Sequence, residues 1–279
     1  MAVKIVTDST CDLPPQIAQE LGVTVVPLYV ISGDVSYREG IDITADEFYE
    51  MLRKSRELPT TSAPSVGDFQ GVYQRLLDEG HSLVSIHLSG KLSATVTIAQ
   101  TAADSTSSPE RIAVVDSQSL SVGMSFAIME AAAAVRAGGG LEEVRAAAES
   151  VAGRLYIEFM LDTLEYVRRG GRIGRARAYL GTMLRIKPIL SVRDGEIYPV
   201  ERVRTRSQGV ERIIQTAVRH QNVTMAAVGY STTPDEAELI LGRLAMAFPH
   251  ARVFTTRFGP VLGTHGGPGT VGIGVVEGR

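Results

Sequence analysis

The 279-residue sequence has few of the features that cross-link a chain through disulfides or metals or anchor it in a membrane. It contains one cysteine, Cys11, so neither an intrachain disulfide nor a cysteine-rich metal site can form, which is typical of a reducing compartment. The most apolar window, residues 126–135, is interrupted by Glu130 and is too short to cross a bilayer. The N-terminus has no basic segment followed by a long apolar run. We therefore expect a cytoplasmic protein without a signal peptide or an integral membrane segment.

A surplus of basic residues is also missing. The net charge is −3, which argues against nucleic acid or an anionic membrane as the partner of the whole chain. No two histidines have the spacing of a helical zinc pair, so we expect no metal; they are His81, His87, His220, His250 and His265. The Gly-x-Ser-x-Gly elbow, the Walker A loop and the Rossmann glycine fingerprint are absent. The sequence thus offers no nucleotide loop and no cofactor fingerprint.

What is present is a globular composition, with 44% hydrophobic and 21% charged residues, at a length that suits two domains. The first half alternates strands and helices, which predicts a parallel sheet. The second half predicts an α+β arrangement with a hairpin at Asp194-Gly195. We predict an α/β domain over residues 1–150 and an α+β domain with a mixed sheet over residues 151–279. Within the first, we expect one strand over Val23–Ile31 and a loop over Ser32–Asp42.

Hydroxyl side chains precede two predicted helices. Thr61 and Ser62 lead into a helix with Ser65 and Asp68 at its start, and Ser93 precedes another. Helix N-termini favour anions, and we place both turns at the C-terminal ends of parallel strands, where open α/β sheets bind ligands. Thr61, Ser62 and Ser93 are therefore candidates to hold an anionic head group. The alternative is that each hydroxyl only caps its own helix.

The segment Gly259–Gly269 holds five glycines and two prolines in eleven residues. Such a composition predicts a loop rather than a helix or a regular strand. A loop of this kind can bring bare backbone N–H groups close to a ligand, and His265 lies in its middle. We interpret the segment as a binding loop that directs His265 at an acidic ligand. The alternative is a glycine-rich turn with an incidental histidine.

A run of arginines interrupted by Gly170-Gly171 predicts a helix end and a loop. Its members are Arg168, Arg169, Arg172, Arg175 and Arg177. A solvated charged face is the simplest interpretation, but guanidinium groups held in a loop also suit phosphate or an acidic partner. None of these candidates is a nucleophile with a matched base. The set is better suited to bind an anion than to transform one.

A series of motifs in one order along the whole chain resembles the DegV family of bacterial fatty-acid-binding proteins. The motifs are residues 6–9, 61–65, 88–93, 115–117, 164–173, 187–190 and 259–269. The resemblance implies two α/β domains with a long-chain fatty acid bound between them. It also implies a chain that is itself non-catalytic and holds neither ATP, metal nor another cofactor. Family members present the acid to the dihydroxyacetone-kinase-like subunit of a fatty-acid kinase, which forms acyl-phosphate with ATP.

The resemblance also implies roles for individual residues. Thr61 and Ser93 match the hydroxyls that hold the carboxylate, while His265 and Arg172 match residues near the head group that assist phosphoryl transfer or kinase docking. The chain departs from the common family pattern at Ala63, where glutamine is usual, and in the loop around Ser93, where Lys91 and Ala94 replace the usual small residues. These departures bear on the head-group geometry and on the acyl preference.

Two other functions stay open. One is a free-standing enzyme that acts on a small carboxylated or phosphorylated substrate with His265 as its general acid or base. The other is a regulatory module that senses lipid and binds protein or nucleic acid through the arginine run. Turnover by the chain alone would favour the first, and loss of binding on neutralising Arg168, Arg169 and Arg172 would favour the second.

Overall fold

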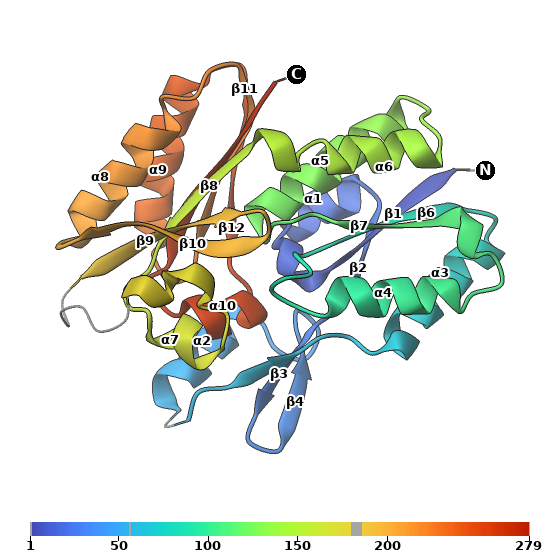
Figure 1. Ribbon diagram of the computed structural model, residues 1–279, viewed down its shortest axis with the longest axis horizontal. Coiled ribbons are helices and arrows are strands. Elements are labelled where there is room, and N and C mark those ends of the chain that lie inside the picture. The colour runs from blue at the N-terminus through green and yellow to red at the C-terminus, as the bar shows by residue number, and fades with distance from the viewer. Residues whose placement is uncertain (1, 56, 180–185, 279) are drawn as a thin grey trace.

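The computed structural model describes residues 2–55, 57–179 and 186–278. Its N-terminal part contains a parallel sheet of β1 (Val3–Asp8), β2 (Val23–Val26), β6 (Ser82–His87) and β7 (Ile112–Asp116). These four strands lie in the order β2-β1-β6-β7 (Figure 1). The parallel sheet predicted from the alternating pattern is confirmed.

The C-terminal part contains a mixed sheet. Its strands are β8 (Leu155–Met160), β9 (Lys187–Arg193), β10 (Glu196–Val203), β11 (Val223–Tyr230), β12 (Arg252–Arg257) and β13 (Val271–Glu277). They lie in the order β10-β9-β8-β13-β11-β12, and only β11 and β12 are parallel neighbours. The predicted hairpin joins β9 and β10 through Asp194 and Gly195, both with positive φ, as a type I′ turn requires.

Helices flank both sheets. They are α1 (Pro15–Glu20), α2 (Ala45–Lys54), α3 (Val66–Asp78), α4 (Thr95–Asp104), α5 (Val122–Arg136), α6 (Leu141–Glu149), α7 (Glu165–Arg169), α8 (Arg206–Ala217), α9 (Pro234–Ala247) and α10 (Pro260–Gly266). Capping boxes begin α2 at Thr44 and α3 at Ser65, and the second confirms the helix start predicted at Ser65 and Asp68. Helices α8 and α9 pack on one face of the mixed sheet (Figure 1).

Helix α5 joins the two sheets. It is buried along most of its length and contacts β1 and β6 of the parallel sheet as well as β11 and β13 of the mixed sheet. One apolar core therefore combines Ile5 of β1, Phe126 of α5 and Met225 of β11. The fold class is the predicted one, a parallel-sheet part followed by a mixed-sheet part. The division near residue 150 stays a prediction.

The expectation of a single strand over residues 23–31 is wrong. The chain forms β2 and then β3 (Tyr29–Ser32), which belong to different sheets. Pro27 lies between them and has no N–H to continue a ladder. Residue Leu28 then donates its N–H to the hydroxyl of Ser9, 2.9 Å away.

The expectation of a loop over residues 32–42 is also wrong in part. Strand β4 (Val35–Arg38) pairs with β3 in a small antiparallel sheet, and β5 (Thr60–Ser62) pairs with the other edge of β3. Strand β4 is mostly exposed, and its sequence, Val-Ser-Tyr-Arg, alternates apolar and polar residues over only four positions, the shortest alternation that indicates a strand.

The glycine-rich segment 259–269 is not a loop throughout, because its first part forms α10. Pro260 stands at the first helical position, where a missing N–H costs nothing. Gly267, with φ 77°, follows the last turn, where only glycine adopts this conformation without strain. The prolines and glycines therefore mark the ends of a short helix, and the composition alone misled the prediction.

Candidate functional site: a pocket between the two sheets

One pocket combines residues from both parts of the chain. The volume of the pocket that the centre of a water molecule can reach is about 110 Å³. A single water needs roughly 10–15 Å³ by the same measure. Its polar side chains are Thr61, Ser62, Ser93, Ser121, Arg172, His265 and Thr270. Its other lining residues are apolar side chains and glycines. The pocket therefore suits a largely apolar ligand with one polar group.

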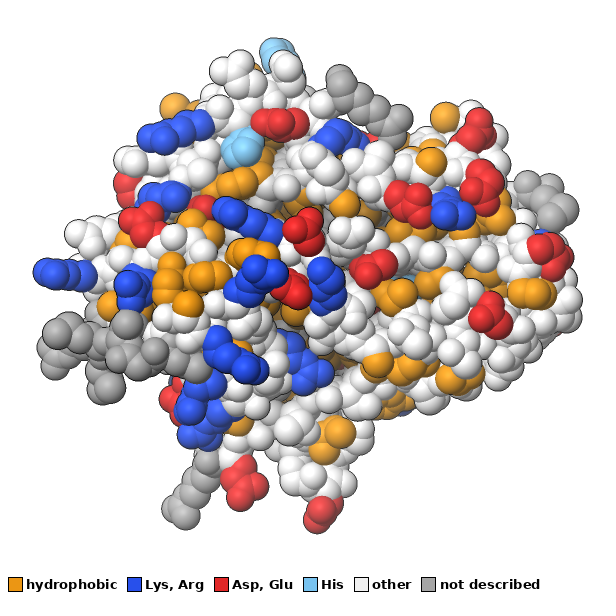
Figure 2. All heavy atoms as spheres, in the orientation of Figure 1, with side chains coloured by type: hydrophobic (Ala, Val, Ile, Leu, Met, Phe, Trp, Pro, Cys, Tyr) orange, Lys and Arg blue, Asp and Glu red, His pale blue; other side chains and the backbone are white. Residues whose placement is uncertain are grey.

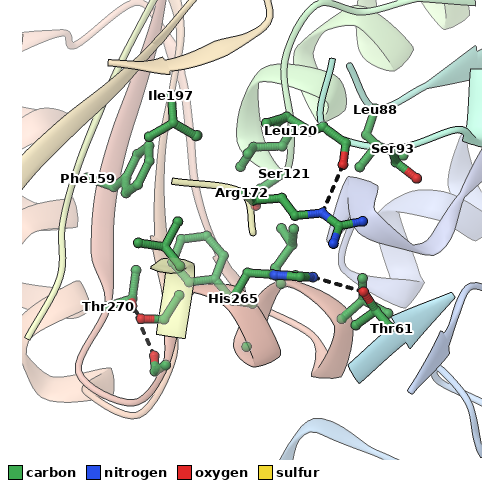
Figure 3. A pocket seen from close by; sticks show the side chains of 18 of the residues that line it. Thr61, Leu88, Ser93, Leu120, Ser121, Phe159, Arg172, Ile197, His265 and Thr270 are labelled. Atoms are coloured by element: carbon green, nitrogen blue, oxygen red, sulfur yellow. Dashed lines mark hydrogen bonds between the residues drawn. The ribbon is translucent and has the colours of Figure 1, made fainter. Parts of the chain in front are cut away.

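Thr61 and His265 meet at the polar side of the pocket. The Oγ1 atom of Thr61 lies 2.9 Å from Nε2 of His265, 204 positions along the chain (Figure 3). Thr61 comes from β5 of the small antiparallel sheet. The prediction that its turn follows a parallel strand at a helix start is wrong, since α3 begins only after Ser65. The hydroxyl nevertheless lines the pocket.

His265 lies in the last turn of α10, and its ring is partly buried. Its Nδ1 atom is fully buried and has no hydrogen-bond partner among the described residues. A Cβ atom added to Gly170 would lie 2.1 Å from this nitrogen, so the ring occupies space that only glycine leaves free. Burial, and then the charge of Arg172, lower the pKa of His265 to about 4. The imidazole is therefore neutral at pH 7.

Ser93 occupies the loop between β6 and α4, where the sequence placed it. Its Oγ atom lies 2.9 Å from the hydroxyl of Thr95 and accepts the Thr95 N–H at 3.4 Å. The serine thus supports the first turn of α4 and lines the pocket as well. Ser62 also lines the pocket, but its hydroxyl donates to the carbonyl of Ala63 at 3.1 Å.

Arg172 connects the two parts of the chain beside these groups. Its Nε donates to the carbonyl oxygen of Leu92 at 3.2 Å (Figure 3). Its Nη1 donates to the carbonyl oxygen of Gly170 at 2.7 Å. The Leu92 carbonyl directly precedes Ser93. The guanidinium therefore ties the turn after α7 to the loop that carries Ser93, while its side chain remains exposed.

The other members of the arginine run lie outside the pocket. Arg169 pairs with Glu165 at 2.7 Å, and Arg175 pairs with Glu196 at 3.1 Å and stacks over the ring of Tyr198. Lys and Arg side chains gather on the face where Figure 1 places α7 and the β9–β10 hairpin (Figure 2). Of the run, only Arg172 is among the described residues that line the pocket.

The apolar side of the pocket could not be read from the sequence. Ile157 and Phe159 alternate along β8, and Gly272 of β13 lies directly opposite Phe159. Figure 3 shows Phe159 and Ile197 on the side opposite Thr61 and Ser93. The glycines at alternate positions 272 and 274 were a sequence signal of close packing at this strand, because a Cβ atom at Gly272 would lie 2.8 Å from the Cβ atom of Phe159.

Among the described residues, no cluster of histidine, cysteine or acidic side chains has the arrangement of a metal site. In the same ranges, no helix has the length and apolarity needed to span a bilayer. The chemistry of the pocket therefore comes from hydroxyls, one imidazole, one guanidinium and an apolar wall.

Comparison with known proteins agrees with this geometry. The model of a family described as uncharacterised proteins of the DegV family matches residues 2–278. A DegV domain-containing protein of Halalkalibacterium halodurans is 37% identical over 97% of both chains. Protein DegV of Bacillus subtilis is 33% identical over 98% of both chains.

Solved structures resemble the whole chain. A DegV family protein from Thermus thermophilus, described for its fatty-acid binding, superposes with a TM-score of 0.92 at 36% identity, covering 99% of this chain and 100% of that one. DegV of Bacillus subtilis, described as a fatty-acid-binding protein, gives 0.91 at 32% identity with the same coverage. A stearic-acid-binding protein from Eubacterium ventriosum gives 0.90 at 27% identity, covering 99% and 98%. The chain belongs to the DegV family.

Proposed function

We propose that this chain is a cytoplasmic carrier that binds a long-chain fatty acid and presents its carboxylate to a kinase subunit for ATP-dependent acyl-phosphate formation. The carrier supplies the substrate but is not itself the enzyme, and it holds neither ATP nor a metal. The observation that carries the proposal is that one pocket combines a largely apolar lining with Thr61, Ser93, Arg172 and His265, and that Phe159 and Ile197 lie on the side opposite Thr61 and Ser93 (Figure 3).

The apolar side supports the choice of a fatty acid. Burying a methylene group contributes roughly 0.8 kcal/mol, so a long acyl tail supplies most of the binding free energy. The head group then needs only a few hydrogen bonds to fix its position. Glycines at positions 263, 266, 267 and 272 also line the pocket and leave room for an unbranched chain.

The head group is assigned to Thr61 and Ser93. An unprotonated buried Nδ1 costs less than an orphaned N–H group, so we assign the proton of His265 to Nε2, facing Thr61. The ring N–H then donates to Oγ1, and the Thr61 hydroxyl keeps its own proton for the ligand carboxylate. Ser93 supplies a second hydroxyl. This division of donors fits a carboxylate, which accepts hydrogen bonds and donates none.

Arg172 is assigned to the phosphoryl-transfer step. It lies beside His265 and lines the same pocket. A fixed guanidinium stabilises the charge of a transferring phosphoryl group, and an acidic kinase surface would be attracted to the neighbouring arginines. His265 assists from its neutral state by holding Thr61.

Mass spectrometry of a lipid extract from the purified, unheated protein tests the proposal. We expect a long-chain fatty acid at close to one molecule per chain. If the protein carries no fatty acid, even after incubation with a mixed pool, the carrier function is refuted. Turnover of a small carboxylated substrate by the chain alone would then make His265 the candidate general acid or base.

A further inference from the structure

Two buried carboxyl groups lie outside the ligand pocket and have no part in the function proposed above. Asp12 follows the short 3₁₀ segment Ser9–Cys11 and has a left-handed backbone, with φ 48°. Glu39 follows β4 of the small sheet. Asp12 is 8% exposed and Glu39 is 6% exposed. Acidic side chains are rarely buried to this degree without a partner.

Both carboxyl groups hold the beginning of α10. The N–H of Gly259 donates to Oδ1 of Asp12 at 2.9 Å, and the N–H of Val261 donates to Oε1 of Glu39 at 2.8 Å. A Cβ at Gly259 would lie 2.4 Å from Oε1 of Glu39 and 3.3 Å from Oδ1 of Asp12. The two carboxyl groups therefore lie against the same glycine, Gly259, although they come from two different segments of the chain.

Asp12 is held firmly on its other side. Its Oδ2 accepts the hydroxyl of Ser121 at 2.5 Å, and its carbonyl oxygen accepts that of Thr256. Glu39 also faces the hydroxyl of Ser9, which favours its ionised form and works against the rise of its pKa, but its Oε2 atom is buried and has no hydrogen bond of normal geometry among the described residues. An ionised oxygen in that position would be costly.

No cation balances this pair. None of the ion pairs found within the described residues includes Asp12 or Glu39. The titratable and charged groups near the pair are the carboxyl of Asp8, the thiol of Cys11 and the hydroxyl of Tyr49, with the Arg257 guanidinium 5.6 Å from the centre of the Tyr49 ring. Asp8 is itself bonded to His87 at 3.0 Å. Burial without a counter-charge favours the protonated form of a carboxyl group.

The acid–base properties agree with this arrangement. Burial is the main reason that the pKa of Glu39 rises to about 7. Burial, and then the charge of Glu39, raise the pKa of Asp12 well above its ordinary value. Both carboxyl groups therefore hold their protons to a higher pH than exposed carboxyl groups do.

We propose that Asp12 and protonated Glu39 are positioning residues that hold the first turn of α10 and thereby keep His265 against Thr61. This inference rests on the proposed function, because it concerns the same head-group site. Helix α10 spans seven residues, from its held first turn to His265 in its last turn. Because the helix is one short rigid unit, an anchor at its start fixes the ring at its end.

The arrangement makes ligand retention depend on pH. As the pH rises through about 7, Glu39 loses its proton, and the cost of a buried charge favours release of the first turn. His265 then loses its fixed contact with Thr61. By linkage, the proton favours the held state about tenfold at one pH unit below the midpoint and little above it, so we expect oleic acid to bind up to about tenfold more weakly at pH 8 than at pH 6.

The test compares Glu39→Gln with Glu39→Ala. Delipidated protein is titrated with oleic acid at pH 6, 7 and 8, with Glu50→Gln on the exposed face of α2 as the control. Glutamine keeps an acceptor for the Val261 N–H but cannot ionise. We expect this variant to bind as the wild type does at pH 6 and to show no pH dependence. Alanine should weaken binding at every pH. A glutamine variant that keeps the wild-type pH dependence, or an alanine variant that binds normally, would overturn the inference.

A second readout separates this inference from the carrier function. If the wild type binds no oleic acid at any pH, the proposed function fails, and the positioning of His265 is still measurable without a ligand. The ¹⁵N shifts of the His265 ring, identified with His265→Asn, should change with a midpoint near pH 7 in the wild type and stay constant in Glu39→Gln. The ring itself titrates far below this range. Identical shift profiles in the two proteins would refute the inference that the proton of Glu39 helps to hold α10.

Discussion

At the scale of single residues, the two hydroxyls of the polar side differ in what holds them. Thr61 is held by His265, whereas Ser93 is held by Thr95 in its own loop. Removing the Thr61 hydroxyl therefore removes both a proposed ligand donor and the partner of the histidine. Removing the Ser93 hydroxyl removes a proposed donor and a weak support of α4.

Thr61→Val keeps the shape and the β-branch of the side chain. A hydrogen bond to a charged group contributes about 1.5–3 kcal/mol, so we expect fatty-acid affinity to fall roughly 10- to 100-fold. Equilibrium titration with a fluorescent fatty acid measures the change. Thr101→Val on α4, whose hydroxyl bonds within its own helix, is the matched control. Equal affinity of both variants would remove Thr61 from the site.

Arg172→Gln should separate binding from transfer. The acyl tail contributes most of the affinity, so fatty-acid retention should change less than about threefold (roughly 0.6 kcal/mol). Acyl-phosphate formation with the kinase subunit should fall by a factor of ten or more, because the phosphoryl group loses a fixed positive charge. Arg145→Gln on α6, remote from the pocket, should leave both unchanged. Normal turnover by the Arg172 variant would contradict its assignment.

The sequence placed these residues among its candidates through their types and their motifs. It could not supply the contact between Thr61 and His265, which joins positions 204 residues apart. The same holds for Arg172, whose bond to the Leu92 carbonyl depends on two loops from different parts of the chain. Long-range partners are fixed by packing rather than by local sequence.

At the scale of elements, α10 depends on the glycine that ends it. Gly267 has φ 77°, and a Cβ there would lie 2.2 Å from the ring of Tyr166. Gly267→Ala combines backbone strain of about 1 kcal/mol or more with this overlap. We expect a thermal midpoint lower by several degrees and weaker fatty-acid binding.

Gly242→Ala provides the matched control for this prediction. Gly242 lies in α9, and no atom lies within 4 Å of a Cβ built there. Alanine favours a helix interior by about 0.5–1 kcal/mol over glycine, so this variant should be slightly more stable than the wild type. Differential scanning calorimetry measures both. If the two substitutions shift the midpoint equally, the close packing at Gly267 is not important for stability.

The elements with strong local signals were predicted, and the others were not. The capping boxes of α2 and α3 and the Asp194-Gly195 hairpin depend on neighbours in the sequence. Helix α10 lacked such a signal because its glycines also suit a loop. The short strand β4 was missed because it pairs at the edge of a small sheet and is mostly exposed.

At the scale of the whole molecule, the buried neutral His265 affects stability in acid. Its pKa is lowered in the folded state, so the unfolded chain takes up the proton more readily, and stability is lost as the pH falls from about 6.5 to about 4. A pKa difference of this size changes the free energy of unfolding by at most about 3 kcal/mol. His265→Asn should therefore lose less stability than the wild type between pH 6.5 and pH 4.5. Urea titrations at the two pH values measure it, and an equal loss in both proteins would contradict the lowered pKa.

The shared core around α5 has a consequence for how the molecule unfolds. Because one apolar cluster includes strands of both sheets, neither part can lose its packing without exposing the other. The chain should therefore melt in a single cooperative transition, with calorimetric and van't Hoff enthalpies in agreement, although its size and its two sheets would suggest two independent steps. On the proposed function, we therefore predict that the fatty acid enters and leaves through local movement of loops and of α10 rather than through separation of the two sheets.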